Sequence, residues 1–469
     1  MESGRRGGAA EGAGPAALRR TLTFRDLVVY GLLFIAPMAP VGIFGTLLAT
    51  SHGAITLVYV VATAAMACTA YSYAQMVRVA PRAGSVYTYA RVGLGEGAGF
   101  VAGWMAMLDY LLIPAVAYLF SGIALHALVP SVHQWVWTAL AVVVTTLLNL
   151  WGVRTAAVVG FVVLALELAV LVVFVGAAGY VLVTAGARRG WSEPFTGAGA
   201  FSPAAVLAAV SVAVLSFLGF DAIASFAEES AGGPRRVARA VLACLAVAGV
   251  LFAVQTYLAA LLAPVSAAGL AARPGEQGSA FYVTAEAAVG PWLGQLVAAG
   301  KAVGAAFAAL AGQAAAGRLL FAMARDRRLP GAMAEVDARR GVPRRALLGA
   351  AGVTLVAAVW AARRDDGLEQ LSSIVNVGAL TAFGLLHASV IGWFRFRARE
   401  RAGLPGVLRH VVVPVLGLVV VVAVLVAASP TAQAVGGCWL AVGLVWLAVQ
   451  YGRRSRPGGA GTGEGGAAG

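Results

Sequence analysis

Apolar residues in this chain gather into long runs, and short polar stretches separate one run from the next. Twelve such runs lie near residues 24–48, 55–77, 97–127, 133–150, 155–183, 204–229, 236–263, 291–323, 346–362, 369–397, 408–427 and 431–451. Most are close to the ~20 residues that a helix needs to cross a bilayer. Barrel strands would instead alternate polar and apolar residues over short segments. The pattern therefore predicts an all-α integral membrane protein with twelve transmembrane helices.

Composition supports this prediction and excludes several classes of protein. Hydrophobic residues make up 60% of the 469 residues and charged residues only 12%, about half the charged share of a typical soluble domain. The sequence contains no cysteine–histidine cluster and no phosphate-binding loop. We therefore expect no metal site, no cofactor and no ATP-driven step. No convergent catalytic set is present either, so we expect a protein that is not an enzyme.

The positive charge predicts how the chain is oriented. The net charge is +14, and with the N-terminus inside, 28 of the 33 arginines belong to the cytoplasmic side. Such a bias is typical of cytoplasmic loops. It predicts a multi-pass protein of the plasma membrane with both termini cytoplasmic. The lipid bilayer, and not a nucleic acid, is then the partner that explains the charge. The five arginines that this topology places outside are Arg188, Arg189, Arg273, Arg363 and Arg364.

The order of the spans indicates an internal repeat within one transmembrane domain at residues 21–452, between Gly-rich tails at 1–20 and 453–469 that we expect to be disordered. The first and sixth spans both carry residues that break helices. Pro37 and Pro40 interrupt the first, whereas Gly219 and Asp221 interrupt the sixth. Breaks at matching positions point to a transporter binding site. Alternatively, the two prolines only kink a packed helix.

Three motifs resemble those of the amino acid–polyamine–organocation permeases. They are residues 81–89 (PRAGSVYTY), residues 216–221 (SFLGFD) followed by Glu228 and Glu229, and residues 318–330, which end in Leu-Pro. Residues 104–110 are most similar to bacterial putrescine importers. The resemblance covers roughly residues 20–450. It implies a leucine-transporter-type fold: inverted repeats of five helices at about 24–183 and 204–397, with two further helices at about 408–451.

The same resemblance implies a secondary active transporter that works by alternating access. We expect it to import a small cationic amine of the putrescine type or an amino acid, with protons as the coupling ion. An exchanger, an exporter and a nutrient sensor with a transporter fold are the alternatives.

The break in the first span departs from the pattern of many amino acid permeases of this family. Those proteins carry a Gly-Ser-Gly-type break, and its backbone N–H groups hold the substrate carboxylate. Here the corresponding residues are Met38, Ala39, Pro40, Val41 and Gly42. Because Pro40 has no N–H, the carboxylate site loses a donor. This favours a substrate without a carboxylate, and an amino acid is the alternative.

Ionisable residues inside the spans are the other candidate binding groups, because they are costly in a membrane. Asp109 lies near the middle of the third span, and the adjacent Tyr110 offers a ring face and a hydroxyl to an ammonium group. The resemblance to putrescine importers supports a role for Tyr110. Asp109 could instead bond a neighbouring helix. Around the break in the sixth span, the substrate-binding candidates are Phe217, Gly219, Phe220 and Asp221.

The acidic residues in and after the sixth span each have two interpretations. Asp221 could face the cavity or cap the restarted helix. Glu228 and Glu229 could form a gate or a loop salt bridge.

Glu167 and Lys301 are the candidates for proton coupling, and both stand alone in apolar spans. Desolvation favours the neutral form of each group, so either could exchange a proton near neutral pH. Glu167 could instead bond a neighbouring helix. Lys301 could pair with Glu167 or anchor its helix at the membrane interface.

Overall fold

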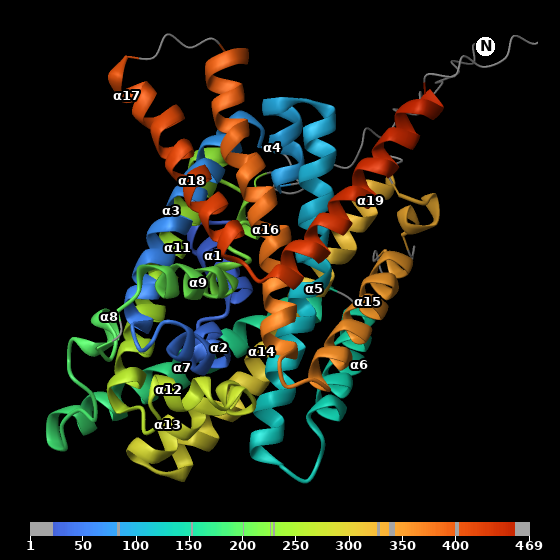
Figure 1. The fold of residues 1–469 in the computed structure, drawn as a ribbon. Coiled ribbons are helices and arrows are strands. Elements are labelled where there is room, and N and C mark those ends of the chain that lie inside the picture. Colours follow the sequence, from blue (N-terminus) through green and yellow to red (C-terminus); the bar gives the residue numbers. More distant parts are fainter. Residues whose placement is uncertain are drawn as a thin grey trace, which may run out of the picture.

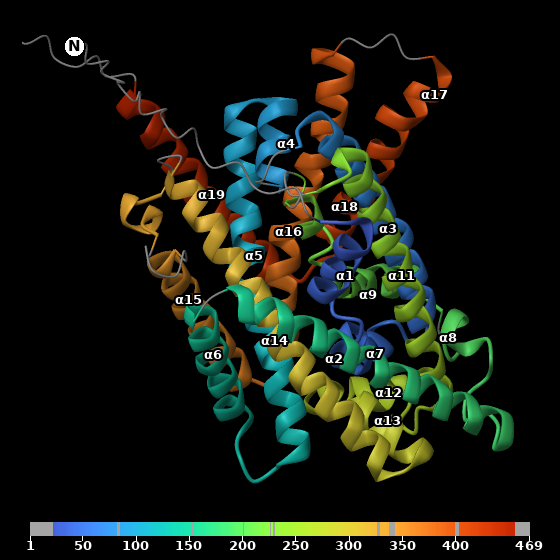
Figure 2. The same cartoon turned by 180° about the vertical axis from the view of Figure 1, so that it is seen from behind.

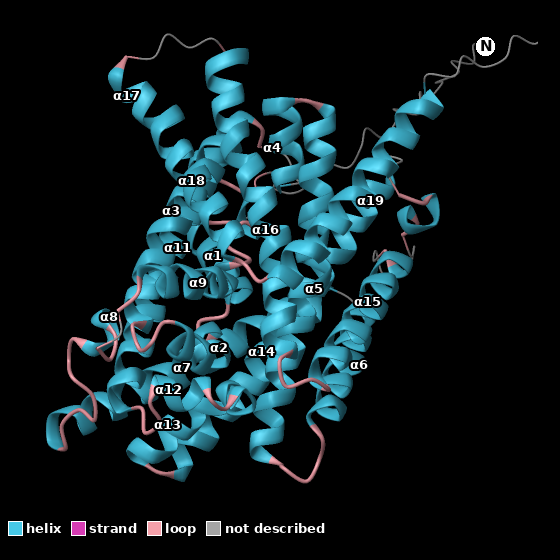
Figure 3. Ribbon diagram, in the orientation of Figure 1, coloured by secondary structure: helices cyan, strands magenta, loops and turns pink. Residues whose placement is uncertain are grey.

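The computed structural model describes residues 22–81, 85–151, 153–199, 201–225, 227, 230–325, 329–336, 343–398 and 403–454. Within these ranges all regular elements are helices, and one isolated bridge joins Leu22 and Ser230 (Figures 1 and 3). The helices are α1 (Phe24–Ile35), α2 (Ala39–Thr50), α3 (Ile55–Val79), α4 (Ser85–Leu94), α5 (Glu96–Leu128), α6 (Gln134–Trp151), α7 (Val153–Thr184), α8 (Glu193–Thr196), α9 (Pro203–Ala213), η1 (Val214–Phe217), α10 (Ala222–Ser225), α11 (Gly233–Leu262), α12 (Ala267–Ala271), η2 (Pro274–Ser279), α13 (Ala280–Val289), α14 (Pro291–Arg325), η3 (Gly331–Ala334), α15 (Arg344–Ala362), α16 (Gly367–Ile391), η4 (Gly392–Arg397), α17 (Leu404–Val407), η5 (Leu408–Val412), α18 (Val413–Ala427) and α19 (Pro430–Arg454).

The number of spans agrees with the sequence prediction. Among the described residues, eleven helical segments are long and apolar enough to cross a membrane, and the bent pair α1 and α2 brings the number to twelve. The chain is thus a multi-pass helical membrane protein. The predicted tails, apart from residues 453–454, lie outside the described residues. So do Glu228 and Glu229.

The helices form two groups that pack against each other. One group contains the broken spans α1–α2 and α9–α10 together with α3 and α11, and the other contains α5, α6, α14 and α15. Helices α7 and α16 contact both groups. The short α4 lies at one end of the molecule, here called the α4 face, while α12 and α13 lie at the opposite α12 face (Figures 1 and 2).

Local sequence explains where the first span starts and stops. Thr23 caps α1 through a reciprocal box, because its hydroxyl accepts from the Asp26 N–H (3.3 Å) while the Asp26 carboxylate accepts from the Thr23 N–H (2.8 Å). The helix ends at Ala36, which has a φ of 60°. Pro37 follows and has no N–H to continue the helix. Helix α2 then restarts at an angle of 47° to α1.

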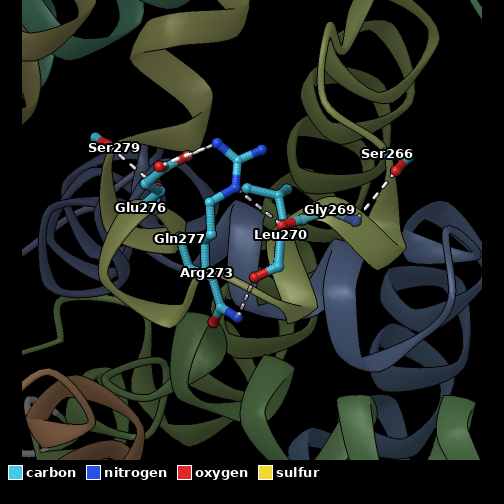
Figure 4. Close-up of polar contacts among 7 residues, drawn as sticks. All are labelled: Ser266, Gly269, Leu270, Arg273, Glu276, Gln277 and Ser279. Carbon is cyan, nitrogen blue, oxygen red and sulfur yellow. Dashed lines mark hydrogen bonds and ion pairs between the residues drawn. The ribbon is translucent and has the colours of Figure 1, made fainter.

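The segment between α11 and α13 is folded, although hydropathy marked it only as a loop. Arg273 joins its two short helices, since its guanidinium lies 3.0 Å from Glu276, and the Gln277 amide donates to the Leu270 carbonyl (3.0 Å) (Figure 4). This α12–η2 unit rests on α2, where Gly45 leaves room for the Gln277 backbone. Helix α2, which follows the break in the first span, is therefore covered from the α12 face.

Two tryptophans fasten α19 to α5. Each indole N–H donates to the other residue's backbone carbonyl, at 2.8 Å from Trp104 to Trp439 and 2.9 Å in return. The rings stack with centroids 4.8 Å apart. The pair satisfies both indole donors where water is scarce.

Close backbone packing between α16 and α5 gives a first prediction. A methyl group on Gly378 would meet the Met105 carbonyl at 2.9 Å and the Asp109 amide nitrogen at 3.1 Å. We expect Gly378→Ala to lower the free energy of unfolding by about 1–3 kcal/mol, because backbone cannot move aside easily. Thermal unfolding of the purified protein in detergent measures this effect.

The control for this substitution is Gly437→Ala on α19, where nothing lies within 4 Å of the added methyl group. It should leave the unfolding temperature unchanged or slightly higher. Equal losses for the two variants would contradict the packing argument.

Candidate functional site

The first three residues of α2, which follow the break in the first span, offer no free N–H to a carboxylate. Of the first three residues of α2, Ala39 donates its N–H to the Ala36 carbonyl (2.8 Å) and Val41 donates to the Met38 carbonyl (3.1 Å). Pro40 has no N–H. The N-terminus of a helix usually presents free N–H groups to an anion. Here these groups are used within the chain or missing.

The break in the sixth span lies against the first. Helix α9 tightens into the 3₁₀ segment η1 and stops, and the chain turns at Gly219, which has a φ of 109°. A side chain at this position would lie 3.0 Å from the Phe34 carbonyl oxygen. Only glycine meets both demands, a left-handed conformation and contact with the backbone of α1. Asp221 follows two residues later and precedes α10.

A cavity of about 90 Å³ lies between the two breaks and helices α5 and α14. At ~10–15 Å³ for each water-sized group, it has room for roughly six to nine non-hydrogen atoms. Its lining is mostly apolar, with polar groups at separate places. Six of the candidates named from the sequence line it: Ala39, Asp109, Tyr110, Gly219, Asp221 and Lys301.

Two carboxylates meet at the end of the cavity that is nearer the α4 face. The Tyr110 hydroxyl donates to Asp221 Oδ2 (2.9 Å), and the Tyr73 hydroxyl approaches the same oxygen at 3.5 Å. Asp221 also faces the N–H of Gly219 within the break, and it lines the cavity. Asp109 is buried at 7% exposure, and its Oδ1 has no hydrogen-bond partner. This end is therefore rich in acceptors.

Lys301 occupies the other end of the cavity. Its Nζ donates to the Met38 carbonyl in the break (3.1 Å) and lies 4.7 Å from the centroid of the Phe120 ring. Asp109 and Phe120, which line the two ends, are about 16 Å apart along α5 at 1.5 Å per residue. Lys301 is only 1% exposed, so it is not an interface anchor.

Glu167 lies beside Lys301 but outside the cavity lining. Its side chain packs against Gly304, one turn after Lys301 on α14, and the two charges interact electrostatically. Glu167 Oε1 is buried without a hydrogen-bond partner. The two proton-coupling candidates are therefore neighbours on adjacent helices, α7 and α14.

Other candidates lie away from the cavity. Phe217 packs against Tyr59 and Phe252, and Phe220 packs edge to face against Tyr73. Met38, Pro40, Val41 and Gly42 are buried in and after the first break and do not line the cavity.

The sequence analysis missed Tyr73 and Phe120. Tyr73 lies in a span with several aromatic residues, so nothing in the sequence distinguished it. Its hydroxyl accepts from Ser85 (3.4 Å), a member of the PRAGSVYTY motif, and this contact ties the motif to the site. Among the described residues, no group of three or more His, Cys, Asp or Glu side chains could hold a metal ion.

Comparison with known proteins agrees with this architecture. A family model described as "Amino acid permease" matches residues 27–450. The chain is 28% identical over 439 residues to the low-affinity putrescine importer PlaP of Escherichia coli, covering 92% of this chain and 93% of that protein. It is 26% identical over 468 residues to the branched-chain amino acid permease BcaP of Lactococcus lactis, covering 93% and 95%. It is also 27% identical over 400 residues to the vacuolar cationic amino acid transporter 4 of Arabidopsis thaliana, covering 81% and 64%.

The bond from Tyr110 to Asp221 should contribute to stability. Tyr110→Phe removes the donor and leaves a buried carboxylate oxygen poorly satisfied, so we expect a loss of about 1–3 kcal/mol in the free energy of unfolding. Thermal unfolding without substrate measures it. Tyr282→Phe is the matched control, because the buried Tyr282 hydroxyl has no partner to lose. Similar losses in both variants would refute the assignment.

Proposed function

The chain belongs to the amino acid permease family, and from that membership we propose that it imports a small cationic amine without a carboxylate, of the putrescine type. The family is one of transporters and not of enzymes. Import would proceed across the plasma membrane by alternating access, coupled to protons, with both termini in the cytoplasm. An amino acid substrate is the alternative, and exchange or export is the alternative to import.

The observation that carries the substrate proposal is the chemistry of the two helix breaks. At the end near the α4 face, Asp109 and Asp221 offer carboxylate oxygens to an ammonium group, and the Tyr110 ring lies beside them. Charge-assisted hydrogen bonds of this kind are the strong ones. The first turn of α2, where a substrate carboxylate would bind, has no free N–H among Ala39, Pro40 and Val41. The site thus favours a cation over a zwitterion.

The relatives support the proposal without deciding between substrates. PlaP is named a putrescine importer, whereas BcaP is named a branched-chain amino acid permease. An amino acid needs hydrogen-bond donors for its carboxylate, whereas an amine needs only acceptors for its ammonium group. Because acceptors outnumber free donors around the two breaks, their chemistry supports the amine. The cavity's room for roughly six to nine non-hydrogen atoms also suits a short diamine.

Proton coupling is proposed for Lys301 and Glu167. A protonated Lys301 holds the Met38 carbonyl and thereby the break in the first span. Transfer of its proton to the neighbouring Glu167 would weaken that bond and release the break. This links a proton movement to the part of the chain that must move during transport.

The substrate proposal can be tested by binding. Putrescine should raise the unfolding temperature of the wild-type protein by mass action. Asp109→Asn should weaken its binding about tenfold or more, because a hydrogen bond to a charged group is lost. Asp365→Asn removes one carboxylate charge from an exposed loop residue and serves as the control. If only compounds that carry a carboxylate stabilise the wild-type protein, the amine proposal is wrong.

The coupling proposal can be tested by flux into proteoliposomes. We expect an imposed proton gradient to drive accumulation of labelled putrescine, and an uncoupler to abolish it. Glu167→Gln should abolish gradient-driven accumulation while substrate counterflow continues, because it removes only the proton acceptor. Glu286→Gln, on an exposed position of α13, should behave as wild type.

Three outcomes would contradict parts of this proposal. Equal wild-type rates with and without the gradient would refute coupling. Normal accumulation by Glu167→Gln would refute its role as proton acceptor. Binding without any accumulation would favour a sensor.

A further inference from the structure

Helix α5 contains an interior proline whose effect falls on the candidate site. Pro114 lies inside this long span, four residues after Tyr110. In a regular helix the N–H of residue 114 would donate to the carbonyl of residue 110. Proline has no N–H, so the Tyr110 carbonyl loses its helical donor.

The residue that carries the freed carbonyl lies on the cavity side of α5. Tyr110 and Pro114 are four residues apart and so share one face of the helix, and both line the cavity. A carbonyl without a partner is costly inside a membrane unless a neighbour or a cavity group meets it. The adjacent Leu111 carbonyl has such a neighbour, the Thr354 hydroxyl of α15 at 3.1 Å. For the Tyr110 carbonyl, the adjacent cavity is the available source of a partner.

We propose that the main-chain carbonyl of Tyr110, freed by Pro114, is a ligand for the primary ammonium group of the substrate. The proposal rests on the amine function proposed above and adds a residue that determines specificity. A primary ammonium has three N–H donors. Asp109, whose Oδ1 has no partner, Asp221 and the Tyr110 carbonyl together offer an acceptor for each of them.

This arrangement selects for hydrogen-bond donors and not only for charge. A quaternary ammonium carries the same charge but no N–H, so it makes no hydrogen bond to the carbonyl. The site should therefore bind putrescine more tightly than its fully N-methylated analogue. Pro114 contributes to the ratio of the two dissociation constants without contacting the ammonium through its own side chain. It is therefore a positioning residue.

The test compares the two amines on two variants. Pro114→Ala supplies an N–H that can bond the Tyr110 carbonyl, and we expect the ratio of dissociation constants for the two amines to fall about tenfold. A merely structural effect of the proline would weaken both amines alike and leave the ratio unchanged. Thr354→Val is the control, because it removes the bond to the Leu111 carbonyl and leaves the Tyr110 carbonyl free. It should keep the wild-type ratio.

A second measurement uses the wild-type protein and does not depend on the folding of Pro114→Ala. With ¹³C at the tyrosine carbonyl carbons, putrescine should shift one amide band to lower frequency in the infrared difference spectrum, and the N-methylated analogue should not. If this shift is absent, or if folded Pro114→Ala keeps the wild-type ratio of dissociation constants, the inference is wrong. The proposed function is unaffected by either result. If the wild-type protein binds neither amine, the proposed function fails, and this inference fails with it.

Discussion

The contact between the two interrupted spans is the constraint on which the rest of the structure depends. Gly219 of the sixth span lies against the backbone of Phe34 in the first, so two chain segments without regular helical bonds meet in mid-membrane. Such backbone is stable there only where protein or a cavity satisfies it. The Lys301 ammonium, the Gln255 amide and the cavity meet these needs, with Lys301 bonding the Met38 carbonyl and Gln255 the Pro37 carbonyl (3.0 Å).

From this constraint follows the polarity of the cavity. The carboxylates of Asp109 and Asp221 lie at one end, and Lys301, which bonds the Met38 carbonyl of the first break, lies at the other. Between them α5 and α14 approach closely through small residues such as Gly312, which contacts Pro114. A mostly apolar cavity with charged side chains at both ends is the result.

Hydropathy predicted the spans within a few residues because burial in lipid requires nothing more than apolar length. It could not predict α4 or the α12–η2 unit, since these short helices are held by specific contacts such as that of Arg273 with Glu276. The candidate site, too, could be predicted only in part. Buried charges such as Asp109 and Asp221 stand out in an apolar span, whereas an aromatic residue does not.

The sequence could not predict in which direction the side chains near the breaks point. Phe217 and Phe220 lie on either side of Gly219, and both pack into aromatic clusters and do not line the cavity. Tyr73 reaches Asp221 from another helix, and only the packing of α3 against the sixth span reveals that contact.

The reciprocal bonds between Trp104 and Trp439 decide to which part of the molecule α19 belongs. Because each indole holds the other helix's backbone, α19 is fixed to the same group of helices as α5 and does not touch the broken spans through this pair. During alternating access, α19 would therefore move together with the group that contains α5, and the surface that it presents to lipid would keep its place relative to that group.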